Sequence, residues 1–131
     1  MNSSTIRIIT LALVAILVGA VLYLGGCCWR NYRTFQKTER TVRDGLNETL
    51  AARKIDPIAV VVLPGASRIF GVPETIRIEQ SLFRTDDVTG RRPAGQLRGV
   101  FHRKTGQIQV DMDFVDGKRA HGVTQMLNPV P

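Results

Sequence analysis

The sequence predicts an α+β fold in which an N-terminal transmembrane helix is followed by an amphipathic helix packed on an antiparallel sheet of four or five strands. Three observations predict it. An uncharged apolar run comes first, a proline-free stretch with helical spacing follows, and the remainder alternates apolar and polar residues between Gly and Pro turns. We therefore divide the chain into an N-terminal tail (1–7), a transmembrane helix (8–29), a basic amphipathic helix (30–56), an antiparallel β domain (57–127) and a C-terminal tail (128–131).

The apolar run is long enough to cross a bilayer. From Ile8 to Cys28 it holds 21 uncharged residues. At ~1.5 Å per residue these form a rod of roughly 30 Å, which matches the hydrocarbon core. Aromatic rings and then positive charges mark its C-terminal end, as is typical of a membrane interface. The expected interface residues are Tyr23, Trp29, Arg30, Arg33 and Lys37.

A cleaved signal peptide and a lipoprotein signal are the alternatives to an uncleaved anchor. A signal peptide has an apolar core of about 7 to 15 residues and a small-x-small cleavage site, and neither is present. Leu24-Gly25-Gly26-Cys27 resembles a lipobox, in which Cys27 would carry lipid, but Tyr23 and the long apolar run argue against it. Cys27 and Cys28 are also candidates for palmitoylation. As small apolar residues at the end of the helix, they need no function.

The distribution of positive charge predicts the side of the membrane. The N-terminal flank offers Arg7 and the amino terminus. The other flank carries more positive charge, on Arg30, Arg33, Lys37, Arg40 and Arg43. The positive-inside rule therefore places the folded domain in the cytoplasm. A short N-terminal tail with one Arg is also typical of a signal anchor whose domain lies outside, so that alternative stays open.

The chain is basic, with a formal net charge of +7. Such a domain favours anionic partners. We expect membrane lipid and a membrane protein complex as partners. We expect no nucleic acid, because Arg91-Arg92 is too short a basic cluster and is better explained as solvated charge on a loop.

The stretch after the apolar run predicts a helix with one apolar stripe. Phe35, Val42, Leu46 and Leu50 recur at spacings of 7, 4 and 4 residues, which puts them on one face. Gly45 marks a bend or a close contact. Asp56-Pro57 is expected to end the helix, because the residue before Pro disfavours the α region.

Two strands and a loop are expected next. Residues 58–63 form a short β-branched run that ends in the turn Pro64-Gly65. Residues 75–84 alternate, with their apolar side chains on one face. Residues 86–95 are polar and contain Gly and Pro, which predicts a mobile loop.

The clearest strand signal is the alternation of apolar and polar residues from Gln107 to Phe114. We expect the preceding strand to pair with it through the turn Thr105-Gly106. A second turn at Asp116-Gly117 returns a last strand over residues 119–125. The expected pairs are Phe101 with Val110, Gly99 with Met112, Leu97 with Phe114, Arg98 with Asp113 and His102 with Gln109.

The side chains weighed for chemistry are His102, His121, Asp111, Asp113 and Asp116. Strand spacing puts Asp111 and Asp113 on one exposed face, and His121 can lie across from Asp113. Exposed strand faces carry charge for solubility, and catalysis needs such groups in a cleft. We therefore expect no enzyme, no metal and no cofactor.

Gly95-x-x-x-Gly99, then Gly106-Gln-Ile-Gln-Val and Asp116-Gly117-Lys118, carry a resemblance to a known family. With the membrane helix and the amphipathic helix, this pattern resembles the small membrane-anchored α+β domains of the cytochrome oxidase assembly factor Coa1 and the translocase subunit Tim21. The resemblance covers about residues 30 to 123. Ile108 stands where such domains often have Trp. The resemblance implies a non-enzymatic assembly or docking role and carries over no functional residue.

Two functions are thus expected. The first is a single-pass, membrane-anchored interaction or assembly module, whose basic helix lies against lipid or a partner and whose sheet offers an edge for docking. The alternative is a lipid-anchored, periplasmic or envelope domain that binds a ligand.

Overall fold

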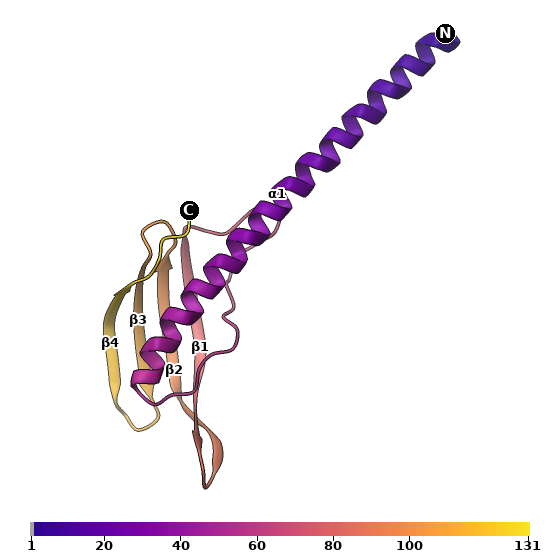
Figure 1. Cartoon of the computed structure of the whole chain (residues 1–131). Coiled ribbons are helices and arrows are strands. Elements are labelled where there is room, and N and C mark those ends of the chain that lie inside the picture. The colour runs from indigo at the N-terminus through magenta and orange to yellow at the C-terminus, as the bar shows by residue number, and fades with distance from the viewer. Residues whose placement is uncertain (1) are drawn as a thin grey trace.

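The computed structural model describes residues 2–131, which contain one helix and four strands. Figure 1 shows the C-terminal half of the helix lying across one face of the sheet, while its N-terminal half projects away from the folded domain. The α+β prediction is confirmed. The elements are α1 (Ser3–Ala52), β1 (Thr75–Asp86), β2 (Gly90–His102), β3 (Gln107–Phe114) and β4 (Arg119–Met126).

The apolar run and the amphipathic stretch form one continuous helix. α1 is 50 residues long and has no break between Trp29 and Arg30. It ends at Ala52, before the expected end at residue 56. Lys54 adopts a left-handed conformation with φ of 58°, and the N–H of Ile55 donates to the carbonyl of Leu50 at 3.0 Å. This reversal ends the helix before the proline is reached.

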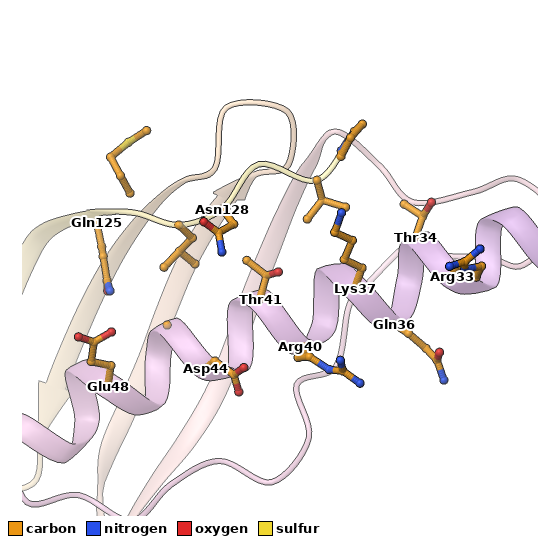
Figure 2. A pocket seen from close by; sticks show the side chains of 15 residues that line it. Arg33, Thr34, Gln36, Lys37, Arg40, Thr41, Asp44, Glu48, Gln125 and Asn128 are labelled. Atoms are coloured by element: carbon orange, nitrogen blue, oxygen red, sulfur yellow. The ribbon is translucent and has the colours of Figure 1, made fainter.

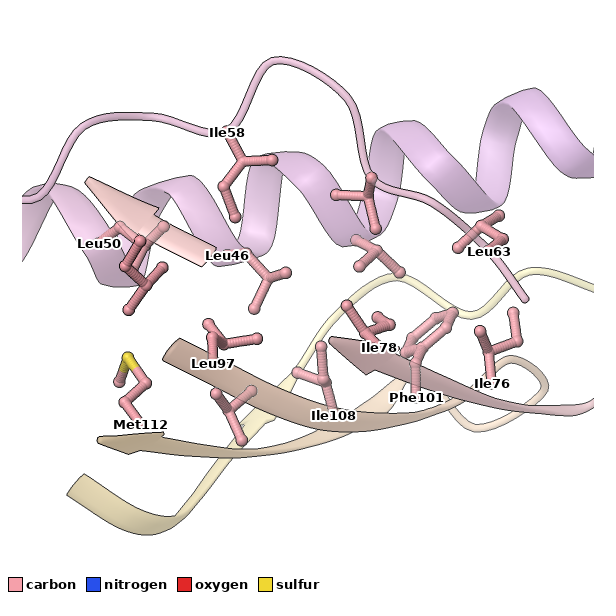
Figure 3. Close-up of a cluster of buried hydrophobic side chains, with 14 of the residues drawn as sticks. Leu46, Leu50, Ile58, Leu63, Ile76, Ile78, Leu97, Phe101, Ile108 and Met112 are labelled. Atoms are coloured by element: carbon pink, nitrogen blue, oxygen red, sulfur yellow. The ribbon is translucent and has the colours of Figure 1, made fainter. Parts of the chain in front are cut away.

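The four strands form an antiparallel meander in the order β1-β2-β3-β4. The predicted helix stripe and strand faces meet in the core that Figure 3 shows, where α1 covers the inner face of the sheet. Full burial of a Leu or Ile side chain contributes roughly 1.5 to 3 kcal/mol, so this layer supplies most of the stability of the domain. The residues with at most 1% exposure include Val42, Leu46 and Leu50 of α1, and Ile76, Ile78, Leu82, Leu97, Phe101, Ile108 and Met112 of the sheet.

The expected register of β2 and β3 is wrong by two residues. A four-residue loop, 103–106, joins these strands, so that His102 pairs with Gln107 and Phe101 with Ile108. The cause lies at Gly106, which has φ of +78° and donates its N–H to the carbonyl of His102 at 2.8 Å. Because the displacement is even, each side chain keeps its expected face. The observed pairs are Gly99 with Val110, Leu97 with Met112, Gly95 with Phe114 and Arg98 with Asp111.

Residues 58–63 are extended but are not a strand. They run along α1, and polar side chains of the helix bind their backbone. The N–H of Val61 donates to Glu39 Oε1 at 3.2 Å, and Asn47 bonds to both backbone groups of Ile58. The segment therefore needs no neighbouring strand, although Ile58, Val61 and Leu63 still enter the core.

Residues 86–95 are not a mobile loop. Most of them belong to the hairpin of β1 and β2, which reverses tightly between Asp86 and Gly90. Arg92 bonds to Asp86 at 2.8 Å across this hairpin. Pro93 is tolerated opposite Phe83 because the register shifts there.

Residues 128–131 are not a free tail either. Val130 is 1% exposed, and its N–H donates to the carbonyl of Arg103 at 2.8 Å. The N–H of Leu127 donates to the carbonyl of Gly106 at 2.7 Å. The end of the chain therefore packs against the loop between β2 and β3. The predicted turn at Asp116-Gly117 is confirmed, with β4 following it.

Candidate functional site

The N-terminal half of α1 is apolar and stands free of the domain. Among the described residues, α1 is the one helix long and apolar enough to cross a membrane, and its most apolar window has no residue buried inside the chain. The side chains of Leu11, Leu22 and their neighbours are exposed all around the helix. A helix that is apolar on every side is typical of a membrane span. We call residues 8–28 the apolar segment.

The predicted interface residues lie where this segment meets the domain. Tyr23 and Trp29 are exposed, and so are Arg30, Arg33 and Lys37. The ring of Trp29 lies 6.2 Å from the ring of Tyr32, measured between centroids. Cys27 and Cys28, which directly precede Trp29, are half-buried free thiols. Sequence reasoning did not single out Tyr32, although it continues the aromatic pattern.

The segment between α1 and β1 forms a loop that reaches the same part of α1, beside Asn31. Asn31 Nδ2 donates to the carbonyls of Arg68 and Ile69 at 2.9 and 3.2 Å. The guanidinium of Arg68 lies 5.0 Å from the centroid of the Tyr32 ring. This contact joins two parts of the chain that no sequence pattern connects.

An open groove lies between α1 and the end of β4, with a volume of about 830 Å³. Figure 2 shows Lys37 and Thr41 on the side of α1 that faces the C-terminal segment. At one end the groove is closed by Leu127, which packs on the bare backbone of Gly45, and by a 2.8 Å hydrogen bond from Thr49 to Gln125. The close contact expected at Gly45 is confirmed. The end toward the apolar segment is open.

The charges along the groove are ordered. Arg33, Lys37 and Arg40 line the end nearer the apolar segment, and Asp44 and Glu48 line the other. In the described part of the chain, the three cations are exposed and make no ion pair. They follow at helical spacings of 4 and 3, so they lie on one side of α1. The end of the groove nearer the apolar segment therefore offers three cations without an ion-pair partner among the described residues.

The side chains weighed for chemistry are spread over open surface. The Nε2–H of His121 donates to Asp113 Oδ1 at 2.9 Å, so these two residues do meet as expected. That hydrogen bond is the main cause that lowers the pKa of Asp113, partial desolvation opposes it, and nearby positive charges add to it. Asp111 instead accepts the N–H of Gly122 at 2.7 Å, and Asp116 accepts that of Lys118.

His102 lies apart from these side chains, at the far end of the sheet. Its Nδ1 is 3.5 Å from the hydroxyl of Thr75. Among the described residues, no three His, Cys, Asp or Glu side chains gather closely enough to hold a metal ion. The Asp113 and His121 pair is exposed. Its geometry stabilises an ionised carboxylate rather than poising a proton for transfer.

Comparison of the chain with protein-family models, with curated proteins and with solved structures finds no match.

Proposed function

We propose that this chain is a single-pass, membrane-anchored, non-enzymatic interaction or assembly module, whose groove binds an extended acidic segment of a membrane protein complex. The observation that carries the proposal is the row of Arg33, Lys37 and Arg40, three unpaired cations in a groove that begins where the apolar segment ends. The resemblance to membrane-anchored assembly domains points to the same role.

The anchor is supported by the length and exposure of the apolar segment. A soluble domain rarely exposes so large an apolar surface, and in water it would associate. With the segment in a bilayer, the basic end of the groove lies beside the headgroups. A partner embedded in the same membrane reaches this site without leaving the surface, which raises its effective concentration.

The shape of the groove favours an extended segment. One wall is α1 and the other is the end of β4 with the residues that follow it. β4 is an edge strand that pairs with β3 on one side, and Gln125 and Met126 at its end line the groove. Extended segments commonly add to such an edge through their main chain, while side-chain pockets give specificity. Carboxylates on this segment would lie opposite the three cations.

The proposal is tested by reversing charge in the full-length chain. Replacing Arg33, Lys37 and Arg40 with Glu, in membranes where a C-terminal reporter shows the same orientation as the wild type, should remove a specific partner from complexes cross-linked in native membranes and identified by mass spectrometry. The matched control reverses Arg77, Arg98 and Lys118, which are exposed cations outside the groove, by the same total charge. A partner lost in both variants, or retained in both, would overturn the assignment to the groove.

A further inference from the structure

We propose that residues 67–71, here called the tip loop, insert into the same bilayer leaflet from which α1 emerges and fix the domain against the membrane. This inference rests on the proposed membrane anchor. The first observation is that two side chains of the tip loop are apolar and exposed. Phe70 is 92% exposed and Ile69 is 67% exposed, side by side at the end of a loop. An exposed apolar pair on a loop needs a partner surface, and the position of the loop identifies that surface.

The tip loop is held at the level where the apolar segment ends. Asn31 Nδ2 donates to two successive carbonyls of the loop, those of Arg68 and Ile69. Asn31 follows Trp29 by two residues, which is about 3 Å along the helix axis. Groups bound at a membrane interface reach about 5 to 10 Å into the boundary of headgroups and acyl chains. The tip loop is therefore already at interfacial depth.

Most backbone polar groups of the loop are bonded within the chain. Ser67 and Gly71 exchange two hydrogen bonds of 2.9 Å, which close the loop. The hydroxyl oxygen of Ser67 accepts the N–H groups of Ile69 and Phe70 at 3.1 and 3.3 Å. Lipid offers no hydrogen bonds to a backbone, so apolar side chains can enter it only where the backbone is bonded internally. The tip loop meets most of this requirement, since the N–H of Arg68 and the carbonyl of Phe70 are its backbone groups without such a bond to a described residue.

The loop is also rigidly based on the domain. Leu63 precedes it and is buried, and Val72 follows it and packs against the core. Gly71 has φ of +91°, a backbone conformation that residues with a side chain rarely adopt, and lies against Asn31. Figure 1 shows the segment between α1 and β1 returning along the helix toward its projecting half before β1 begins. A rigid base lets insertion of the tip fix the orientation of the whole domain.

The flanking residues match an interface. Arg68 lies over the ring of Tyr32, and its charge can reach headgroups while its stem remains over apolar surface. Tyr32 in turn contacts Trp29. Aromatic rings favour the interface, so these residues and Phe70 form one belt around the helix exit. The lipid that surrounds the apolar segment is thus the surface that also covers the exposed apolar pair of the tip loop.

The test measures depth with nitroxide spin labels on the full chain in vesicles of phosphatidylcholine and phosphatidylglycerol. Single cysteines replace Ile16, Phe70 or Val88 in a Cys27→Ser, Cys28→Ser background. Val88 is the matched control, since it is an apolar residue at a loop tip with 89% exposure. It lies beyond the far end of β1, roughly 36 Å from the start of that strand. Collisions with oxygen report lipid, and collisions with a water-soluble nickel complex report solvent.

We expect the label at residue 70 to collide readily with oxygen and several-fold less with nickel than the label at residue 88. Asn31→Ala should release the loop and make the label at residue 70 more mobile and shallower. Equal nickel access at residues 70 and 88, with residue 16 deep in lipid, overturns the inference while the anchor stands. A label at residue 70 shielded from both reagents means a protein partner and also overturns it. If residue 16 is open to nickel, the anchor itself fails.

Discussion

Asn47 of α1 and the backbone of Ile58 exchange two hydrogen bonds, with Nδ2 donating to the carbonyl at 3.0 Å and Oδ1 accepting the N–H at 2.7 Å. The amide thus offers the donor and acceptor that a neighbouring strand would offer. It binds residues 58–63 to the helix and brings the chain back along α1 toward the tip loop. This one side chain therefore supports both the core and the placement of the loop.

Asn47→Ala should lower the free energy of unfolding by about 1 to 3 kcal/mol, because both backbone groups of the buried Ile58 lose their partner. Thermal unfolding of the full chain in mild detergent measures this. Asn128→Ala is the control, since Asn128 is exposed and such changes stay within about 0.5 kcal/mol. Equal midpoints for the two variants would show that the paired hydrogen bonds do not stabilise the segment.

Gly45 and Leu127 should be coupled in stability. A Cβ at residue 45 would collide with the side chain of Leu127, so Gly45→Ala should destabilise the wild type or leave it unimproved. In a Leu127→Ala background the collision is absent, and the same change should stabilise the fold by up to about 1 kcal/mol, the difference in helix propensity. Denaturant titration of the four variants gives the coupling energy. Additive effects would mean that the contact is not close.

The hydrogen bond between His121 and Asp113 should be visible in the titration of the carboxyl group. It lowers the pKa of Asp113 below the ordinary value of 3.8. The carboxylate therefore favours the fold at pH above 3.8, and this contribution is lost as the pH falls below 3.8 through the folded pKa. His121→Ala should raise the pKa toward 3.8, as measured by carbon NMR of the full chain. His102→Ala should leave it unchanged; a shift in both variants would refute the assignment.

Periodicity predicted the core well because burial follows from local spacing. Ile76 and Ile78 on β1, and Leu46 on α1, face inward as their positions in the sequence indicate. The register of β2 and β3 did not follow from local spacing. It depends on Gly106, where a side chain would collide with the backbone of Leu127, a residue from the other end of the β domain. The alternation of side chains cannot distinguish two registers that differ by two residues.

The groove and the tip loop could not be predicted, because each depends on contacts between distant parts of the chain. Phe70 is one of two adjacent apolar residues in a short loop, with no periodicity to mark it. The position of its loop against α1 depends on Asn31, which lies 37 and 38 residues before its partners Arg68 and Ile69. Of the groove cations, Arg33 and Lys37 were predicted as interface residues. Their place in a groove could not be predicted, because the groove depends on the packing of Leu127 on Gly45.

The continuity of α1 sharpens the prediction for membrane orientation. Because the helix does not turn at Arg30, each later residue lies about 1.5 Å farther along one straight axis. Arg33 is then about 4.5 Å beyond Arg30, within a Debye length of ~8 Å, whereas Lys37 is about 10 Å beyond it. Arg30 and Arg33 should therefore contribute most to the positive-inside signal, at about 1 kcal/mol each if the leaflet is anionic, and Lys37 should contribute less.

A fluorescent reporter that matures only in the cytoplasm, fused after Pro131, should accordingly be bright in the wild type. Replacing Arg30, Arg33 and Lys37 with Glu, and adding Lys after Met1, should invert the chain and abolish the signal. Reversing Arg77, Arg98 and Lys118 reverses as many positive charges, but on the β domain, so the orientation should hold. A wild-type reporter that is dark places the domain on the other side, where the acidic partner of the groove must then be sought. A bright reporter in the inverted design would mean that these three charges do not set the orientation.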